Sequence, residues 1–202
     1  MLAYVLFGVS LGFASAVQPG PLTAYVISRA LTTGWRRALP MACAPLLSDG
    51  PIAAVALVVL GSIPADFVHL LRLAGGAVVL VLAAQAAHAW RRADTAGAPT
   101  APASRGLLTA AAVNLLNPGV YLGWSLVLGP LVLKGWRESP SRGVAAVASF
   151  YATMVLTLGA LVLVFHSARR LGPRVNRAMI GLSAVALAAF GVYQIGMGIG
   201  GR

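Results

Sequence analysis

Six long apolar stretches occupy most of this sequence and constrain its fold more than any other feature. About 20 mostly apolar residues are enough for a helix to cross the hydrocarbon core of a membrane. Only 9% of the residues are charged, against about 25% in an ordinary soluble domain. Lipid offers the backbone no hydrogen-bond partners, so each stretch must be helical. The sequence therefore predicts an all-α integral membrane protein with transmembrane segments at Leu2–Leu31, Ala38–Leu60, Phe67–Trp90, Leu107–Leu133, Gly143–Phe165 and Ala178–Met197.

The charge is strongly positive, with fifteen Lys and Arg against four acids. A nucleic-acid partner is the weaker interpretation, because the arginines form short clusters between apolar stretches. Cytoplasmic loops of membrane proteins retain such positive charge. With the N-terminus outside, the inner loops hold ten basic residues and the outer ones five. This bias predicts that both termini lie outside and that the inner cations are Arg29, Arg36, Arg37, Arg91, Arg92, Arg105, Arg169, Arg170, Arg174 and Arg177.

Two of the apolar stretches are interrupted at matching places. The first is broken by Gln18 and Pro19-Gly20-Pro21, and the fourth by Asn117 and Pro118-Gly119. Proline removes a backbone donor and clashes with the preceding turn. The freed backbone groups must then face protein or a wet cavity, because in hydrocarbon each costs several kcal/mol. A proline kink relieved by neighbouring helices is the alternative, but the matched positions favour a binding site.

The chain divides into two halves of three spans each. We expect a first repeat over residues 1–90, a linker over 91–106 and a second repeat over 107–202, in one transport domain. Gly76–His88 aligns without gaps to Gly181–Tyr193, and both share Leu-Ala-Ala. Because each half has an odd number of spans, the second half must enter the membrane in the opposite sense. Inverted repeats with discontinuous first helices are typical of secondary transporters.

These motifs resemble the lysine exporter (LysE/RhtB) family of bacterial amino-acid efflux proteins. The resemblance rests on Pro19-Gly20-Pro21, on Asp49, and on Asn114-Leu115-Leu116-Asn117-Pro118. It covers essentially the whole chain, and one departure is Gly119, which stands where the family usually has lysine. The resemblance implies a multi-pass protein of the bacterial inner membrane. Its expected activity is the proton-driven export of amino acids or related small solutes.

Asp49 is the acid that lies well inside an apolar span, about midway along the second. An ionisable group there is costly, by roughly 2.5–3.5 kcal/mol on insertion scales, and is by default a functional hypothesis. It could carry the coupling proton or pair with a cationic substrate. A purely structural acid that supports the broken backbone is the competing interpretation.

The candidate substrate-binding residues beside the breaks are amides and aromatics. Amides both donate and accept, so Gln18, Asn114 and Asn117 could hold a substrate's carboxylate and ammonium or only satisfy freed backbone groups. Tyr25 and Tyr121 follow the breaks and could wall a pocket, as could Trp124, although aromatic side chains more often pack in a core.

The remaining features give no sign of an enzyme. Three scattered histidines predict no metal site, and we expect no cofactor. Cys43, the single cysteine, excludes a thiol–disulfide transporter of related plan, which needs paired cysteines. A membrane scaffold whose broken helices only bend to fit a partner is the alternative to transport. The solute, the coupling ion and a homodimeric state stay open.

Overall fold

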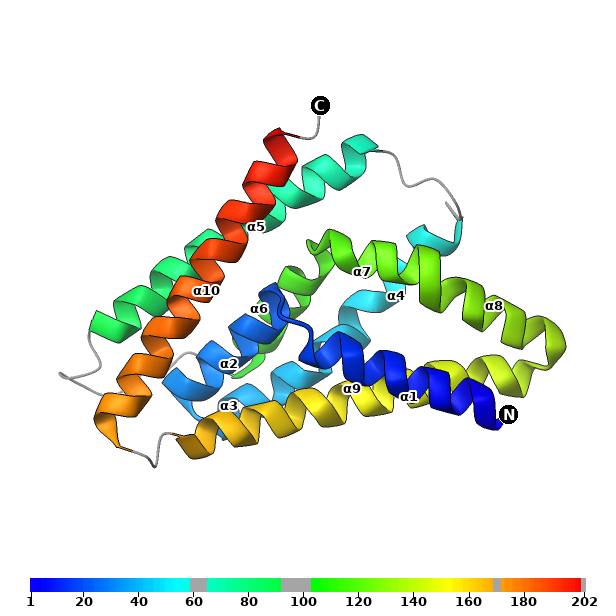
Figure 1. Ribbon diagram of the computed structural model, residues 1–202, viewed down its shortest axis with the longest axis horizontal. Helices are drawn as coiled ribbons and strands as arrows, with labels where there is room; N and C mark the ends of the chain where they lie inside the picture. Colours follow the sequence, from blue (N-terminus) through cyan, green and yellow to red (C-terminus); the bar gives the residue numbers. More distant parts are fainter. Residues whose placement is uncertain (59–64, 92–102, 169–171, 201–202) are drawn as a thin grey trace.

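The computed structural model of the chain describes residues 1–58, 65–91, 103–168 and 172–200; this part is helical almost throughout and contains no strand. Figure 1 shows the arrangement. The elements in chain order are α1 (Leu2–Val17), α2 (Pro21–Thr33), α3 (Trp35–Ala38), the 3-10 turn η1 (Leu39–Cys43), α4 (Ala44–Val58), α5 (Ala65–Arg91), α6 (Ala103–Leu115), α7 (Pro118–Gly123), the π-helical turn η2 (Trp124–Leu128), α8 (Gly129–Glu138), α9 (Pro140–Ala168) and α10 (Pro173–Ile199).

The described helices are long and apolar enough to form a multi-pass membrane protein. Four helical stretches could each cross a membrane, and the number is six if two bent pairs each count as one span. A stretch or a bent pair stands at each predicted position, but the helices run a few residues past the apolar stretches. Hydrogen bonding continues beyond the point where hydropathy falls. Residues 59 and 60 of the second predicted span lie outside the described part.

Both predicted helix breaks are confirmed. The first separates α1 from α2 with a bend of 63°, and the second separates α6 from the α7–α8 stretch with a bend of 60°. In each case a proline opens the next helix, at Pro21 and at Pro118. Proline is favoured there because the first N–H of a helix has no intrahelical acceptor. Trp124–Leu128, just before Pro130, is a π-helical turn that the sequence analysis does not predict.

Small residues let α1 pack closely against α9. The buried positions of α1 are Tyr4, Gly8, Gly12 and Ala16, spaced by four. A β-carbon on Gly12 would lie 2.3 Å from the carbonyl oxygen of Phe150. The opposite face of α1 carries large exposed apolar side chains, including Phe13 at 54% exposure. Close contact through small residues, with large apolar side chains turned outward, is the pattern expected of helices in lipid.

The same kind of contact holds α5 against α10, which run antiparallel on the left of Figure 1. A β-carbon on Gly76 would lie 3.0 Å from the carbonyl oxygen of Gly191, and one on Gly198 would touch Leu73. At the other end of the pair, Arg177 lies over the ring of Trp90. The α5–α10 pair therefore spans the molecule as one antiparallel unit.

The ends of the spans fall on two sides of the molecule. The N-terminus, the α8–α9 turn, the start of α5 and the end of α10 lie to the right and top of Figure 1. The α2–α3 turn, the end of α5, the end of α9 and the start of α10 lie to its left and lower left. Between α2 and α3, Gly34 has a φ of 87°, a value that favours glycine. The described cations on elements that end at the lower-left side are Arg29, Arg36, Arg37, Arg91, Arg174 and Arg177, and Arg105 lies near the start of α6, which packs against Met41. Those on elements that end at the other side are Arg72, Lys134, Arg137 and Arg142.

Two described helices reach into the linker predicted over residues 91–106. Arg91 is the last residue of α5, and Arg105 already lies in α6. A polar or basic residue ends an apolar stretch without ending the helix, because its long side chain can reach the membrane surface. Residues 92–102 lie outside the described part of the chain, as do Arg169, Arg170 and Arg202.

Candidate functional site

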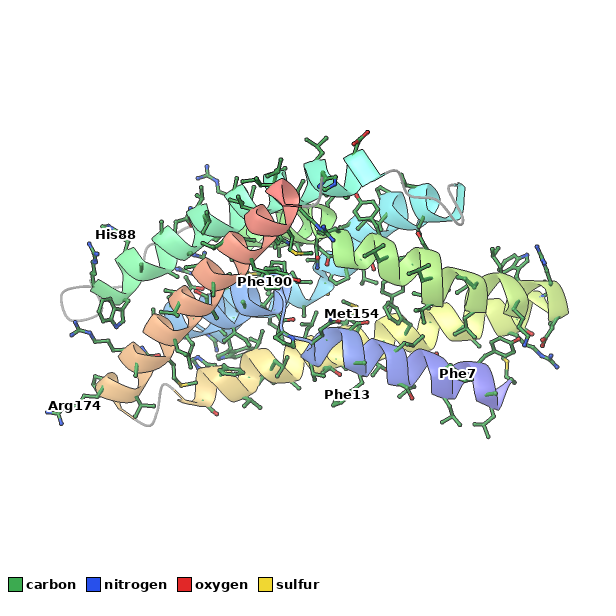
Figure 2. All side chains as sticks on the ribbon, turned by 45° about the horizontal axis from the view of Figure 1, so that its top comes forward. Phe7, Phe13, His88, Met154, Arg174 and Phe190 are labelled. Atoms are coloured by element: carbon green, nitrogen blue, oxygen red, sulfur yellow. The ribbon has the colours of Figure 1, made fainter. Side chains whose placement is uncertain are left out.

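Both helix breaks line one cavity of about 550 Å³. Gln18, Pro19, Gly20 and Pro21 border it from the first break, and Asn117, Pro118 and Gly119 from the second. Its walls also include Met154 of α9 and Phe190 of α10, both labelled in the central part of Figure 2. Segments about a hundred residues apart in sequence thus meet at one place.

Asp49 reaches this cavity from α4. The residue is only 2% exposed. Its Oδ1 accepts a hydrogen bond from Asn114 Nδ2 at 2.7 Å, and its Oδ2 accepts one from the Tyr151 hydroxyl at 3.0 Å. Ser48 Oγ donates to Oδ1 over a longer 3.4 Å. Three helices contribute to this hydrogen-bonded cluster, because α4 carries Asp49, α6 carries Asn114 and α9 carries Tyr151. The first break borders the same cavity.

The groups around Asp49 can accommodate both of its protonation states. An ionised carboxylate only accepts hydrogen bonds and has room for about four, of which three are present. A protonated carboxyl must donate one, and hydroxyl groups can accept it. Tyr151 and Ser48 both carry hydroxyls, and Ser48 also lies 3.1 Å from the Ala44 carbonyl, a second acceptor for its own hydrogen. The cluster can therefore take up or release a proton by turning two hydroxyl groups.

Asn114 and Asn117 have different environments. Asn114 is 1% exposed, and its Nδ2 donates to both Ser48 and Asp49, so it belongs to the carboxyl cluster. Asn117 is the N-cap of α7, where its Oδ1 accepts from the Gly119 backbone N–H at 3.1 Å. That bond satisfies a backbone donor freed by the break. The first break is bridged differently, by the Thr23 hydroxyl, which donates to the Ala16 carbonyl at 3.2 Å.

The structure does not bring every candidate residue to the cavity. Gln18 borders it with an exposed side chain. Tyr25 and Tyr121 are both buried but are not among the residues that line it. Tyr25 lies near Arg29 and Thr109 instead. Both tyrosines belong to the buried core of the protein.

Gly119 stands at the edge of the cavity in an open setting. A β-carbon there would lie 3.2 Å from Asn117 Oδ1, and the Asn117 side chain is the only group within 4 Å among the described residues. Glycine therefore leaves the N-cap of α7 undisturbed. Position 119 therefore presents neither a side chain nor a positive charge to the cavity.

Four residues around the cavity or beside Asp49 could not be identified as binding residues from the sequence. Tyr151 and Ser48 contact Asp49, and no spacing in the sequence connects Tyr151 with an acid 102 positions away. The sequence suggests Trp124 only as a residue that could form part of a pocket wall. In the structure it lies beside Asp49 and Tyr151, and its buried indole N–H has no hydrogen bond of ordinary geometry among the described residues. Gln194 Oε1, in a residue that lines the same cavity, is likewise buried without such a partner. Adjacency to Asp49 is the one signal that could have found Ser48.

Metal binding has no support in the described part of the chain, where no three His, Cys, Asp or Glu side chains cluster. The cavity is instead mostly apolar, with a few polar groups and one buried carboxyl. Such a cavity suits a small organic solute better than an inorganic ion.

Comparison with known proteins yields one match. A search of curated proteins and a search of solved structures each gave no match. The sequence model of one protein family, described as LysE type translocator, matches residues 13–198, which include both breaks and Asp49. The match covers nearly the whole chain. The chain therefore belongs to the LysE type translocator family.

Proposed function

We propose that this protein is a secondary exporter that moves amino acids or related small solutes across the bacterial inner membrane in exchange for protons. The observation that carries the proposal is that both helix breaks and the buried Asp49 border one cavity. Discontinuous helices at corresponding points of two halves are typical of transporter binding sites. The family of translocators to which the chain belongs supports the transport of small solutes.

Asp49 is the coupling acid in this proposal. Export in exchange for a proton requires a group that loads and releases protons from alternate sides of the membrane. Asp49 borders the cavity, and its neighbours Tyr151 and Ser48 can serve the ionised and the protonated carboxyl group equally. A zwitterionic solute can interact with the ionised form through its ammonium group, so that solute and proton compete for one carboxylate.

Alternating access in this proposal uses the two inverted repeats as its moving parts. The bent pairs α1–α2 and α6–α8 correspond to each other in position and in bend angle, 63° and 60°. The distribution of cations favours the lower-left side of Figure 1 as the cytoplasmic one, with both termini outside. The cavity extends to Arg72 and Met197, near the opposite, outer ends of α5 and α10. Under this proposed orientation, the cavity is on the periplasmic side of the helix breaks.

A non-transporting scaffold explains these features less well. A scaffold requires bent helices but not a buried carboxyl group that faces a cavity, since such a group is costly in a membrane. No observation on the described residues favours a partner protein at this site.

Uptake of radiolabelled amino acids into inverted membrane vesicles tests the proposal. In these vesicles the cytoplasmic face is outward, so export appears as accumulation in the lumen. We expect at least one amino acid to accumulate when the lumen is acidic, and the accumulation to collapse when an ionophore removes the proton gradient. Equal uptake in vesicles with and without the protein, across all amino acids, would overturn the proposal.

A further inference from the structure

Arg72 brings the one positively charged side chain to the cavity among the described residues that line it; Asp49 is the one acid there. Arg72 lies on α5, within the apolar part of that helix, which begins at His69. Placing a charged group within a membrane segment is unfavourable, and such residues mark substrate pathways or pair with another group. In the sequence, Arg72 is distinguished only as one of the five basic residues expected outside, with Lys134, Arg137, Arg142 and Arg202.

The guanidinium group of Arg72 is held in place but keeps most of its donors. Its Nη1 donates to the Met197 carbonyl in the last turn of α10 at 3.2 Å. The start of its side chain packs against Gly198, where a β-carbon would lie 3.4 Å from Arg72 Cβ. A guanidinium group has five N–H donors in a planar fork, and no carboxylate among the described residues forms an ion pair with this one.

A purely structural role would account for only part of this arrangement. A cation near the last turn of a helix stabilises its free carbonyls, and the bond to Met197 does this. A lysine could supply that contact equally well. Arg72 also lines the cavity, and the planar N–H donors of a guanidinium match a carboxylate in two parallel hydrogen bonds.

We propose that Arg72 binds the carboxylate of the exported solute, so that the cavity selects solutes with a free carboxylate over the corresponding amides. The inference rests on the proposed function and names the chemistry of its substrate more narrowly. Arg72 lies near the outer ends of α5 and α10 and Asp49 midway along its span, so the solute meets the two charges at different depths of the cavity.

Counterflow in proteoliposomes tests this inference, because exchange samples binding on both faces of the protein. The probes are L-leucine, L-threonine and L-lysine, each compared with its α-carboxamide, which keeps the ammonium group and the side chain. The variants are Arg72→Gln, Arg72→Lys and the control Arg137→Gln, which removes an exposed cation of α8 that does not line the cavity.

For the amino acids that the wild type exchanges, we expect Arg72→Gln to raise the half-saturating concentration about ten- to a hundred-fold, as expected for loss of charged hydrogen bonds. Arg72→Lys should lie in between, and the Arg137 variant should match the wild type. The carboxamides should compete weakly with the wild type and be unaffected by the variants.

Two results overturn the inference separately from the proposed function. If the wild type exchanges an amino acid and Arg72→Gln exchanges it with the same half-saturation, Arg72 does not bind the carboxylate. If Arg72→Gln fails to insert, the wild type alone decides. Equal competition by an amino acid and its carboxamide in the wild type then overturns the inference. If the wild type exchanges none of the three, an amino acid that accumulates in the inverted vesicles replaces them as the probe. If no amino acid accumulates there, the proposed export of amino acids fails, and the inference fails with it.

Discussion

The change Asp49→Asn separates a coupling acid from a structural one. The amide keeps the shape of the carboxyl group and removes its ability to carry a proton. Its oxygen can face Asn114 Nδ2, and its NH₂ group can face the Tyr151 hydroxyl, which then acts as an acceptor. We therefore expect the variant to insert and fold, at a cost within about 1 kcal/mol.

Asp49→Ala gives the contrasting perturbation. It removes the acceptor of one N–H of the buried Asn114 amide and of the partly buried Tyr151 hydroxyl. Each unsatisfied group costs about 1–3 kcal/mol, so the two together cost roughly 2–6 kcal/mol. We expect this variant to be poorly produced, which is why the amide variant carries the test.

The magnitude of the transport effect follows from the free energy of the proton gradient. A difference of one pH unit supplies about 1.4 kcal/mol per proton, which sustains roughly ten-fold accumulation for one proton per solute. Without a coupling acid the gradient cannot drive the solute, so Asp49→Asn should show an accumulation ratio near one. Counterflow needs no net proton movement and should persist.

The assay compares gradient-driven uptake and counterflow in the same preparation of inverted vesicles, normalised to the amount of folded protein. Asp66→Asn is the matched control, because Asp66 is an exposed acid at the start of α5. Near-native accumulation by a well-produced Asp49→Asn would refute the reasoning. The search for the coupling group would then move to Gln18 and Asn117.

Three further predictions follow from the packing and the charge distribution. Tyr151→Phe removes a hydroxyl that can form a hydrogen bond with either protonation state of the Asp49 carboxyl group. Gradient-driven uptake should therefore fall several-fold and its pH profile should shift, while production of the protein stays normal. An unchanged pH profile would contradict that role. Gly75→Ala places a β-carbon 2.5 Å from the Leu116 carbonyl oxygen, so it should lower thermal stability by about 1–3 kcal/mol, whereas Gly196→Ala, with nothing within 4 Å, should not; equal melting temperatures for the two would refute the contact. Single cysteines at either terminus of a Cys43→Ser protein should react with an impermeant reagent from the periplasm, and labelling from the cytoplasm alone would reverse the topology.

The sequence alone determined much of the architecture because the membrane leaves the backbone few choices. An apolar stretch of about 20 residues must be helical in lipid, so span positions could be read from hydropathy. The breaks at Pro19 and Pro118 were also predictable, because a proline next to a glycine cannot continue a helix unperturbed. The cost of burying an acid in lipid made Asp49 a candidate before any contact was known.

The composition of the site was decided only by the tertiary structure. Tyr151 and Arg72 carry no local signal, because a tyrosine in an apolar helix usually packs and an arginine near a helix end usually reaches the membrane surface. Their roles depend on which helix faces which, and that follows from close contacts at glycines such as Gly12 and Gly198. The same packing buries Tyr25 and Tyr121 in the core and leaves them out of the cavity lining, although they follow the breaks in sequence. Sequence periodicity shows that a helix has a face, but contacts between helices far apart in the chain decide what that face meets.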